Sequence, residues 1–334
     1  MNRRSLKSAL TATLFSSLFS PAFAADKINV MFPVWSGFAP VQVAHDLGYY
    51  KDAGLDVDVR FEDDRSNVMA AMERGDIDVD LRTIGEYQAR PRTADTDGVI
   101  IGLIDQSMGG DGVVADGSIK TVADLKGKVV AELPSLPAML LLQLDLKNAG
   151  LTLKDIILKD SEVADSVAVF SDPSIAAVAS AEPFISQAIK LTPSRQPHLI
   201  SSSADHPGYI VDGVIVRKSE IKQYPDKYRR FLTALYRATQ FAEKNPEKFA
   251  ELAAPHYKLS AADFAASVNG SLTYTRLDEA KAAMGTPEKP GSLYDIFDTL
   301  MALVVESGGA DGSLSARSSI DSSIIADIEA GDVK

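Results

Sequence analysis

Residue types that commonly carry out catalysis are few in this chain and do not form catalytic patterns. No His-Glu-x-x-His, Gly-x-Ser-x-Gly or phosphate-loop sequence occurs, and there is no cysteine. Residues 109–112 (GGDG) are not a dinucleotide-binding fingerprint. The four histidines show no metal-ligand spacing: His45, His198, His206 and His256. We therefore expect a protein that is not an enzyme and that uses no cofactor or metal.

Polar and aromatic residues instead follow the first predicted strand. The apolar run 28–32 predicts a buried strand, and Trp35, Ser36 and Gly37 separate it from an amphipathic helix that ends at Gly48. Ligands in open α/β sheets bind at the carboxyl ends of the strands. Trp35 is the only tryptophan, and its ring could cover a small or cationic ligand. Burial in the core is the alternative for a lone tryptophan.

Two segments could present backbone N–H groups to an anionic ligand. Gly110 permits a close approach of the backbone beside the hydroxyl of Ser107, although an ordinary turn explains the same residues. Residues 132–137 (ELPSLP) precede an apolar helix predicted over 137–148, whose N-terminus and Ser135 could bind an anion. Two prolines remove donors there, so a rigid helix entry is the alternative.

The first 24 residues have the features of a secretory signal peptide. Basic residues precede an apolar stretch too short to span a bilayer, and residues 22–24 (AFA) form a cleavage signal. We expect residues 1–24 to be removed, so that the mature chain begins at Ala25. Without a cysteine the chain cannot carry a lipobox lipid anchor. We therefore expect an exported, unanchored protein of a Gram-negative periplasm.

The composition indicates an acidic globular protein. The formal charge is −12, and loss of the three basic residues of the leader makes it −15. Such a surface repels nucleic acid and anionic lipid, so neither is an expected partner. Hydrophobic residues make up 46% of the chain, which is enough for a large core divided between two lobes.

Strand and helix patterns alternate along most of the chain, as is typical of α/β proteins. Beyond residue 219 the pattern is mostly helical. Further strands are predicted over 55–61, 77–81, 99–104, 129–132, 198–201 and 213–216, with a helix over 67–74 and a turn over 109–112.

Residues 35–40 (WSGFAP) and 47–59 (LGYYKDAGLDVDV) resemble the start of a known family. The family comprises periplasmic solute-binding proteins of ABC importers for sulfonates, taurine, nitrate and thiamine-precursor pyrimidines. The resemblance implies an α/β protein with the type II periplasmic binding fold, in which two mixed sheets flanked by helices are joined by two crossovers at a hinge. It implies a first lobe of residues 25–112 and 213–334, a second lobe of residues 113–212, and a ligand cleft between them.

The resemblance also assigns residues to the cleft. The family has a Thr and a Glu at the places of Thr83 and Glu86, although a carboxylate at a helix N-terminus is a general stabilising feature. Residues 105–111 (DQSMGGD) resemble its Asp-x-Ser-x-Gly-Ala-Asp motif, which would place Asp111 in the cleft and substitutes Gly110 for the alanine.

Two more acidic residues follow from motifs in the second half of the chain. Residues 181–183 (AEP) resemble the family's Trp-Glu-Pro, with alanine in place of tryptophan, so Glu182 could face the cleft or cap the next helix. Residues 207–212 (PGYIVD) resemble a motif at the return crossover, which would place Asp212 beside the hinge. With Glu86, Asp111 and Glu132, these residues predict an acidic cleft. Such a cleft favours a zwitterion such as an aminosulfonate, or an amine, over a bare dianion.

The function implied by the resemblance is capture of a small polar organic solute, with taurine or another aliphatic sulfonate as the leading candidate. Hinge closure would deliver the solute to the permease and ATPase complex of the inner membrane, and we expect the binding protein to be a monomer. A receptor subunit that presents its ligand to a sensor kinase fits the same pattern. An enzyme of this fold acting on a pyrimidine-like compound is disfavoured, because the family's pyrimidine-forming members depend on a cysteine motif. Sulfonate, pyrimidine, amine and amide ligands all fit the sequence.

Overall fold

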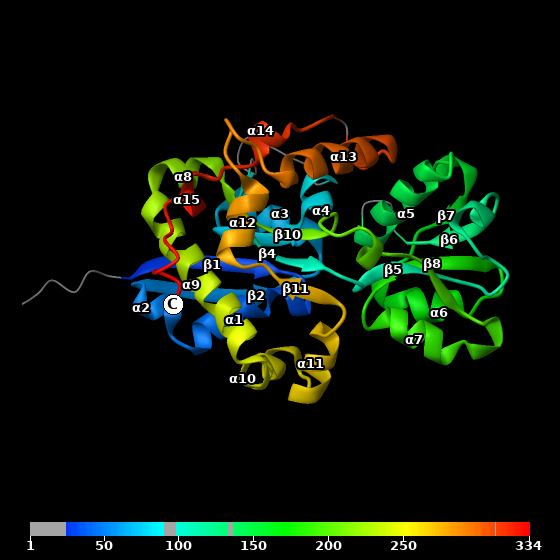
Figure 1. The fold of residues 1–334 in the computed structure, drawn as a ribbon, viewed down its shortest axis with the longest axis horizontal. Helices are drawn as coiled ribbons and strands as arrows, with labels where there is room; N and C mark the ends of the chain where they lie inside the picture. The colour runs from blue at the N-terminus through cyan, green and yellow to red at the C-terminus, as the bar shows by residue number, and fades with distance from the viewer. Residues whose placement is uncertain (1–24, 90–97, 133–135, 311) are drawn as a thin grey trace, which may run out of the picture.

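The chain folds into two lobes, each built around its own sheet (Figure 1). The computed structural model describes residues 25–89, 98–132, 136–310 and 312–334. The expected signal peptide and Ser135 therefore lie outside the described residues. Two segments connect the lobes, one between β4 and β5 and the other between β9 and β10. In the described part of the chain, no helix is long and apolar enough to cross a bilayer.

The larger lobe contains a six-stranded mixed sheet in the order β11-β4-β10-β3-β1-β2. Strands β1, β2 and β3 are parallel, whereas β10 runs antiparallel to β3 and β4, and β11 runs antiparallel to β4. The strands are β1 (Asp26–Phe32), β2 (Leu55–Phe61), β3 (Val79–Thr83), β4 (Gly98–Ser107), β10 (Val211–Arg217) and β11 (Leu272–Tyr274).

The smaller lobe contains a five-stranded mixed sheet in the order β7-β6-β8-β5-β9. Helix α5 covers one face of this sheet, and α6 and α7 cover the other (Figure 1). The strands are β5 (Asp111–Ala115), β6 (Val129–Ala131), β7 (Ile157–Lys159), β8 (Ile175–Ala181) and β9 (His198–Ser202). The two mixed sheets and two crossovers confirm the predicted fold class.

Helices flank both sheets. In the larger lobe they are α1 (Ala39–Asp46), α2 (Tyr49–Asp52), α3 (Arg65–Arg74), α4 (Ile84–Ala89), α8 (Lys218–Gln223), α9 (Pro225–Lys244), α10 (Pro246–Ala253), α11 (Ala261–Val268), α12 (Leu277–Met284), α13 (Ser292–Glu306), α14 (Ala316–Ser319) and α15 (Ser323–Ala326). In the smaller lobe they are α5 (Pro137–Asn148), α6 (Ser166–Phe170) and α7 (Phe184–Leu191), with short 3-10 turns including η1 (Ser36–Phe38) and η2 (Val122–Leu125).

Local sequence signals explain several of these boundaries. Asp64 caps α3 by accepting a hydrogen bond from Ser66 N, and the helix ends at Gly75, whose φ of +76° suits a residue without a Cβ. The predicted strand over 77–81 lies two residues too early, because Asp78 N binds the β1 carbonyl of Asn29 before the ladder of β3 begins. The predicted turn over 109–112 is also shorter in the structure, since β5 already starts at Asp111.

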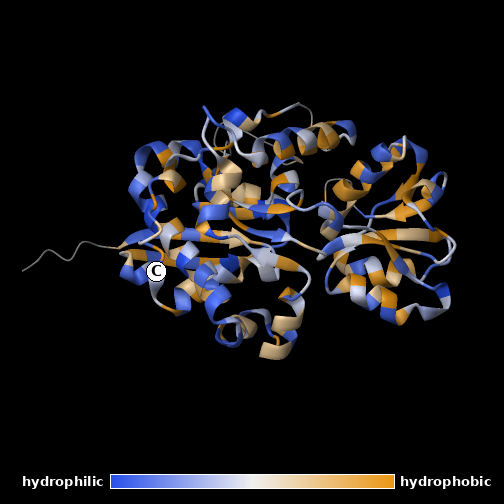
Figure 2. Cartoon of the chain, in the orientation of Figure 1, coloured by the Kyte–Doolittle hydropathy of each residue, from blue (hydrophilic) through white to orange (hydrophobic). Residues whose placement is uncertain are grey.

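Apolar burial holds each lobe together. Figure 2 shows hydrophobic residues concentrated on the strands of the smaller lobe and in the helices on both sides of them. The larger lobe has an extended core between its sheet and α1, α4, α9, α12 and α13, and smaller clusters under α10 and α11 and under α3. The smaller lobe has separate clusters on the two faces of its sheet. Each lobe thus has an apolar core of its own.

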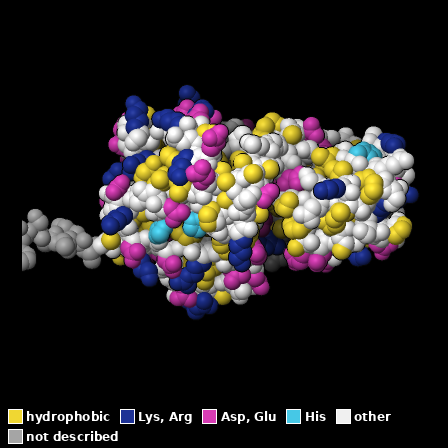
Figure 3. Space-filling view, turned by 90° about the horizontal axis from the view of Figure 1, so that it is seen from below, with side chains coloured by type: hydrophobic (Ala, Val, Ile, Leu, Met, Phe, Trp, Pro, Cys, Tyr) yellow, Lys and Arg dark blue, Asp and Glu magenta, His cyan; other side chains and the backbone are white. Residues whose placement is uncertain are grey.

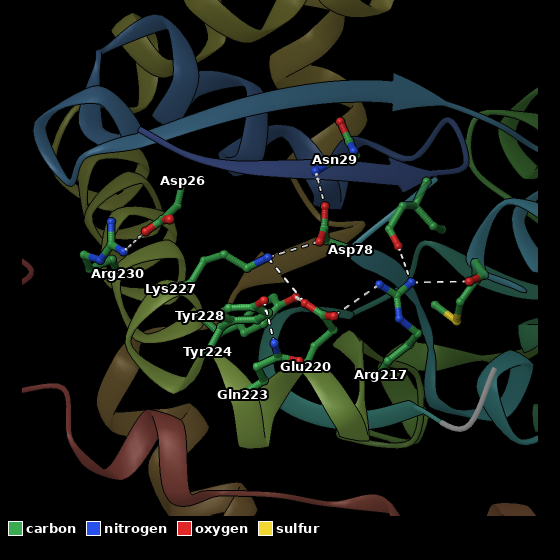
Figure 4. A network of polar contacts seen from close by, with 12 residues as sticks. Asp26, Asn29, Asp78, Arg217, Glu220, Gln223, Tyr224, Lys227, Tyr228 and Arg230 are labelled. Carbon is green, nitrogen blue, oxygen red and sulfur yellow. Dashed lines mark hydrogen bonds and ion pairs between the residues drawn. The ribbon is translucent and has the colours of Figure 1, made fainter. Parts of the chain in front are cut away.

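A polar network closes the end of the larger sheet where β1 begins (Figure 4). Asp78 accepts hydrogen bonds from Asn29 N at 2.8 Å and from Lys227 Nζ at 3.1 Å. Glu220 accepts from the Tyr228 hydroxyl at 3.1 Å, and Arg217 Nη1 donates to Ile77 O at 2.6 Å. At this end the half-buried charges have partners of opposite sign, which is the arrangement expected of a structural network.

Candidate functional site

The opposite end of the larger sheet carries a row of polar side chains on neighbouring strands. Tyr274 of β11 pairs with Asp105 of β4, Asp105 pairs with Asp212 of β10, and Asp212 pairs with Thr83 of β3. Residues directly opposite each other in a sheet present their side chains on the same face. The strand register therefore brings two carboxyls, a hydroxyl and a phenol into one line across four strands.

Asp105 and Asp212 form a buried carboxyl pair at the centre of this row. Asp105 is fully buried and Asp212 is 3% exposed. Their side chains hydrogen-bond to each other, which requires a proton between the two carboxyls. Burial raises the pKa of Asp105 to about 7. Burial and then the charge of Asp105 raise the pKa of Asp212 well above its usual range.

Trp35 lies against this pair. Its indole Nε1 donates to Asp105 Oδ1 at 3.2 Å, and its backbone carbonyl accepts from the Tyr257 hydroxyl at 2.9 Å. Gly37 makes this approach possible, because a Cβ there would lie 2.3 Å from both Asp105 Oδ2 and Trp35 Nε1. The indole is half-buried and packs against the core of the larger lobe.

Ser36 is turned toward the neighbouring helix α11. Its Oγ lies 2.8 Å from Ser267 Oγ, and its carbonyl accepts from the Tyr274 hydroxyl at 2.9 Å. Ser36 therefore fixes the loop that carries Trp35.

Glu86 in the first turn of α4 adds a third carboxylate, which has a cation beside it. The Thr83 hydroxyl donates to Glu86 Oε2 at 3.0 Å, and Arg82 Nη1 lies 3.4 Å from Glu86 Oε1. Burial works against the charge of Arg82, but Asp80 and Glu86 outweigh it and raise the pKa of the guanidinium. Because Arg82 already faces two carboxylates, it does not neutralise the remaining acids of the site.

The first crossover holds Ser107, Gly110 and Asp111 in a hydrogen-bonded turn. The hydroxyl of Ser203, from the second crossover, makes three hydrogen bonds with this turn. Its Oγ lies 2.8 Å from Ser107 Oγ and accepts from Gly109 N at 2.7 Å and Asp111 N at 3.3 Å. Gly110 N donates to Ser271 O at 2.9 Å. These N–H groups, which the sequence suggested as anion donors, therefore have protein acceptors.

Gly110 is required by close packing. A Cβ at this position would lie 2.7 Å from Ser271 O and 2.9 Å from Trp35 Cη2. The substitution of glycine for the family's alanine thus lets Trp35 approach the crossover.

Asp111 and Glu132 contribute carboxyls from the smaller lobe. Burial raises the pKa of Asp111 to about 7. Burial and then the charge of Asp111 raise the pKa of Glu132 well above its usual range. Met139 N–H donates to the Glu132 carboxyl, so the protein's own acid occupies the N-terminus of α5 where an external anion was considered.

The two lobes thus present carboxyls to one another where they meet. Asp111 and Glu132 both interact electrostatically with Glu86 of the larger lobe, and Asp111 also interacts with Asp105 and Asp212. No hydrogen-bond donor from the described residues reaches three of the buried oxygens: Asp105 Oδ2, Asp212 Oδ1 and Glu132 Oε2. Figure 3 shows a narrow groove between the lobes. The arrangement can stabilise a cation or a hydrogen-bond donor enclosed between the lobes.

Glu182 does not join this group in the described structure. The Glu182 carboxylate accepts from Ser186 N at 3.3 Å and from Ser186 Oγ at 2.8 Å, which is the capping alternative for the start of α7. Ser135 lies outside the described residues.

A large cavity lies elsewhere. It has a volume of about 860 Å³ and lies beside β11, with walls that include Phe249, Phe264, Val268 and Leu293. It contains none of the acids described above. The described residues include no group of three or more His, Asp or Glu side chains arranged to hold a metal ion.

Sequence reasoning missed Asp105 and Ser203. Asp105 begins the 105–111 motif and is the only charged residue in the apolar strand β4, which was a usable signal. Ser203 has no such signal, because its role depends on the two crossovers lying side by side.

The model of one protein family, described as NMT1/THI5 like, matches residues 35–249. The match covers more than half of the chain and spans every site residue from Trp35 to Asp212. The chain belongs to the NMT1/THI5-like family.

Relatives of this NMT1/THI5-like protein carry the same fold. A protein of Brucella abortus, described no further than as a binding protein, is 24% identical over 265 residues, covering 79% of this chain and 81% of that protein. The periplasmic aliphatic sulphonate binding protein SsuA of Escherichia coli superimposes with a TM-score of 0.71 at 18% identity, covering 89% of this chain and 92% of SsuA.

A second solved structure has a similar TM-score with this chain. The alkanesulfonate-binding protein SsuA of Xanthomonas axonopodis pv. citri, bound to MOPS, gives a TM-score of 0.69 at 14% identity, covering 90% of this chain and all of that one. These similarities confirm that the NMT1/THI5-like chain has the periplasmic binding protein fold.

Proposed function

We propose that this protein is the periplasmic substrate-binding component of an ABC importer and that it captures a small organic solute carrying an amine. An aliphatic aminosulfonate such as taurine is the leading candidate. The observation that carries the proposal is the set of buried carboxyls shared between the two lobes: Glu86, Asp105, Asp111, Glu132 and Asp212. One arginine beside Glu86 leaves this set with an excess of negative charge.

A cationic ligand would supply the positive charge and the hydrogen-bond donors that these carboxyls lack. A buried carboxylate without a partner is costly, and a donor that reaches it recovers that cost. An ammonium group presents three donors, enough for the three oxygens that no donor among the described residues reaches. We assign Asp105, Asp212 and Glu132 to the ammonium group, with Asp111 beside them.

The other expected site residues support this contact. The half-buried ring of Trp35 would cover the cation. Thr83 would orient Glu86, while Ser107 and Gly110 would shape the crossover beside the ligand. Ser36, Ser135 and Glu182 are proposed at the margin of the site.

The named relatives support the choice of an aminosulfonate. Two similar solved structures are described as binding sulphonates, and one of them holds MOPS, a compound with both a sulfonate and an amine. Taurine carries the same two groups on a shorter chain. The relatives compared are binding proteins, which supports a role without catalysis.

The remaining parts of the proposal concern the whole protein. Residues 1–24 would be removed on export to the periplasm, and the mature protein would act there as an unanchored monomer. Residues 25–112 and 213–334 would move as one lobe and residues 113–212 as the other, with closure presenting the loaded form to the permease and its ATPase. Within this division Asp111 goes with the smaller lobe, because it begins β5, and Asp212 goes with the larger lobe, because it lies in β10, so we place each boundary two residues earlier than the resemblance implies.

A thermal-shift screen of the mature protein tests the proposal. The screen would contain small amines, aminosulfonates, sulfonates without an amine, and aminopyrimidines. We expect stabilisation by amine-bearing compounds and recovery of the bound compound chemically unchanged after denaturation. Stabilisation only by sulfonates without an amine would contradict the ligand class, and conversion of the compound would contradict the binding role.

A further inference from the structure

Helix α5 has two apolar faces, and each belongs to a different lobe. Ala138, Met139, Leu142 and Leu146 pack into the core of the smaller lobe. Leu140 belongs to the core of the larger lobe, and Leu144 packs against that core. Residues 140 and 142 are separated by roughly 200° around a helix of 3.6 residues per turn, so their side chains point in opposite directions. A helix that is apolar all round is one that is covered on all sides.

Leu140 enters a space that only glycine leaves open. The side chain is 1% exposed and meets α4 of the larger lobe at Gly85. A Cβ added at Gly85 would lie 2.2 Å from Leu140 Cδ1. Gly85 is one residue before Glu86 and two residues after Thr83, so this contact borders the acidic site.

The surface on which the two lobes meet at Leu140 and Gly85 also brings their carboxyls together. Asp111 and Glu132 of the smaller lobe face Glu86, Asp105 and Asp212 of the larger lobe, with Arg82, Tyr257 and Tyr274 beside them. Apolar contact at Leu140 therefore favours closure, whereas repulsion between the carboxyls opposes it.

We propose that Leu140 and Gly85 form a latch that holds the two lobes closed over the site, and that the ligand's positive charge acts by removing the carboxyl repulsion that opposes the latch. The inference rests on the proposed closure of the two lobes but not on the identity of the ligand. The latch is tested without ligand, by protonating the carboxyls at low pH. A negative result would therefore contradict the latch and leave the proposed ligand class untouched.

The distance between the lobes reports on the latch directly. Because the chain has no cysteine, Gln187→Cys on α7 and Ala266→Cys on α11 give two unique and exposed labelling sites, one in each lobe. Distances between spin labels at these sites would be measured without ligand at pH 5 and pH 8. At pH 5, protons on Asp105, Asp111, Glu132 and Asp212 weaken the repulsion.

The matched variants remove the same side chain from opposite faces of α5. Leu140→Ala should shift the distance distribution at pH 5 toward the longer distances seen for the parent protein at pH 8. Leu142→Ala should lower the melting temperature but keep the parent distribution, because Leu142 packs within the smaller lobe. Equal distributions for Leu140→Ala and the parent at pH 5, or equal opening by Leu142→Ala, would overturn the latch.

A second pair of variants tests direct contact. Gly85→Ala should open the lobes, because the added Cβ displaces Leu140. The double variant Gly85→Ala/Leu140→Ala should open no further than Leu140→Ala alone. The leucine side chain that the alanine methyl group at position 85 would displace is then absent. Independent addition of the two effects would contradict a contact between these residues. If the closed fraction falls to about a tenth, the apparent affinity for any ligand of the closed state falls about tenfold.

Discussion

Asp105 and Asp212 lie opposite each other on the antiparallel strands β4 and β10, and their carboxyls share a hydrogen bond in a fully buried position. Two carboxyls in such a position cannot both be ionised without cost. The pair therefore holds a proton when the site is empty and can exchange it for a cationic donor. This exchange links the charge of the ligand to the protonation of the site.

Asp212→Asn should weaken binding of an amine-bearing ligand about tenfold or more, since a tenfold change corresponds to about 1.4 kcal/mol. The amide keeps the hydrogen bond to Asp105 but supplies no charge. Calorimetry with the ligand found in the screen measures the change. Asp56→Asn, on the exposed side of β2, is the matched control and should bind like the parent. Parent-like affinity for Asp212→Asn would remove this residue from the ligand contact.

The stability of the ligand-free protein should fall as the pH rises from about 5 to about 8. Burial raises the pKa of Asp105 and Asp111 to about 7 and raises the pKa values of Glu132 and Asp212 well above their usual range. Unfolded carboxyls titrate near pH 4, so the folded protein binds more protons in this window. The stabilising contribution of these protonated carboxyls to the free energy of unfolding is fully present below about pH 4 and is lost as the pH passes about 7.

Denaturant unfolding at several pH values measures this slope, and Asp212→Asn should make it shallower. Surface carboxyls with lowered pKa values, such as that of Asp226, titrate below the window and do not affect it. An increase in the free energy of unfolding over the same range would show that the buried acids are ionised at little cost.

The emission of Trp35 should titrate with a midpoint near pH 7 in the ligand-free protein. Its indole N–H donates to Asp105, so ionisation of that carboxyl changes the field at the ring. Since Trp35 is the only tryptophan, steady-state fluorescence reports on this contact alone. Asp105→Asn should abolish the titration. The same midpoint in that variant would assign the signal to another group.

Ser203→Ala should lower the free energy of unfolding by about 1–3 kcal/mol, because Gly109 N, Asp111 N and the Ser107 hydroxyl lose a shared partner. Ser66→Ala at an exposed position of α3 is the control and should cost little. Chemical denaturation of both variants tests the difference. Equal stabilities would mean that water replaces the serine hydroxyl at the crossovers.

Periodicity predicted the elements that carry the fold. The apolar run 28–32 is the core of β1, and the helix predicted over 137–148 has the bounds of α5. The predicted and observed element boundaries differ where a backbone hydrogen bond outside a strand ladder holds the chain. The bond from Asp78 N to Asn29 O before β3 is an example.

Motifs singled out Glu86, Asp111 and Asp212 in the sequence, whereas Asp105 and its pairing with Asp212 were missed. Whether Asp212 meets Asp105 depends on the register between strands more than 100 residues apart in sequence, which no local pattern contains. The same limit applies to Ser203 and Ser107, and to Leu140 and Gly85. The protein acceptors of the crossover N–H groups likewise follow from tertiary contacts, which is why those groups resembled an anion site in the sequence.

Calorimetric titration of the mature protein with taurine and with isethionate tests the central claim most directly. The two compounds share the sulfonate and the two-carbon chain, and differ in having an ammonium or a hydroxyl group. Matched pairs of other amines and alcohols from the screen extend the comparison. If the buried carboxyls recognise a cation, each amine should bind at least tenfold more tightly than its alcohol partner and should release protons on binding at pH 7. Equal or tighter binding of the alcohols, or no binding of any amine, would contradict the account.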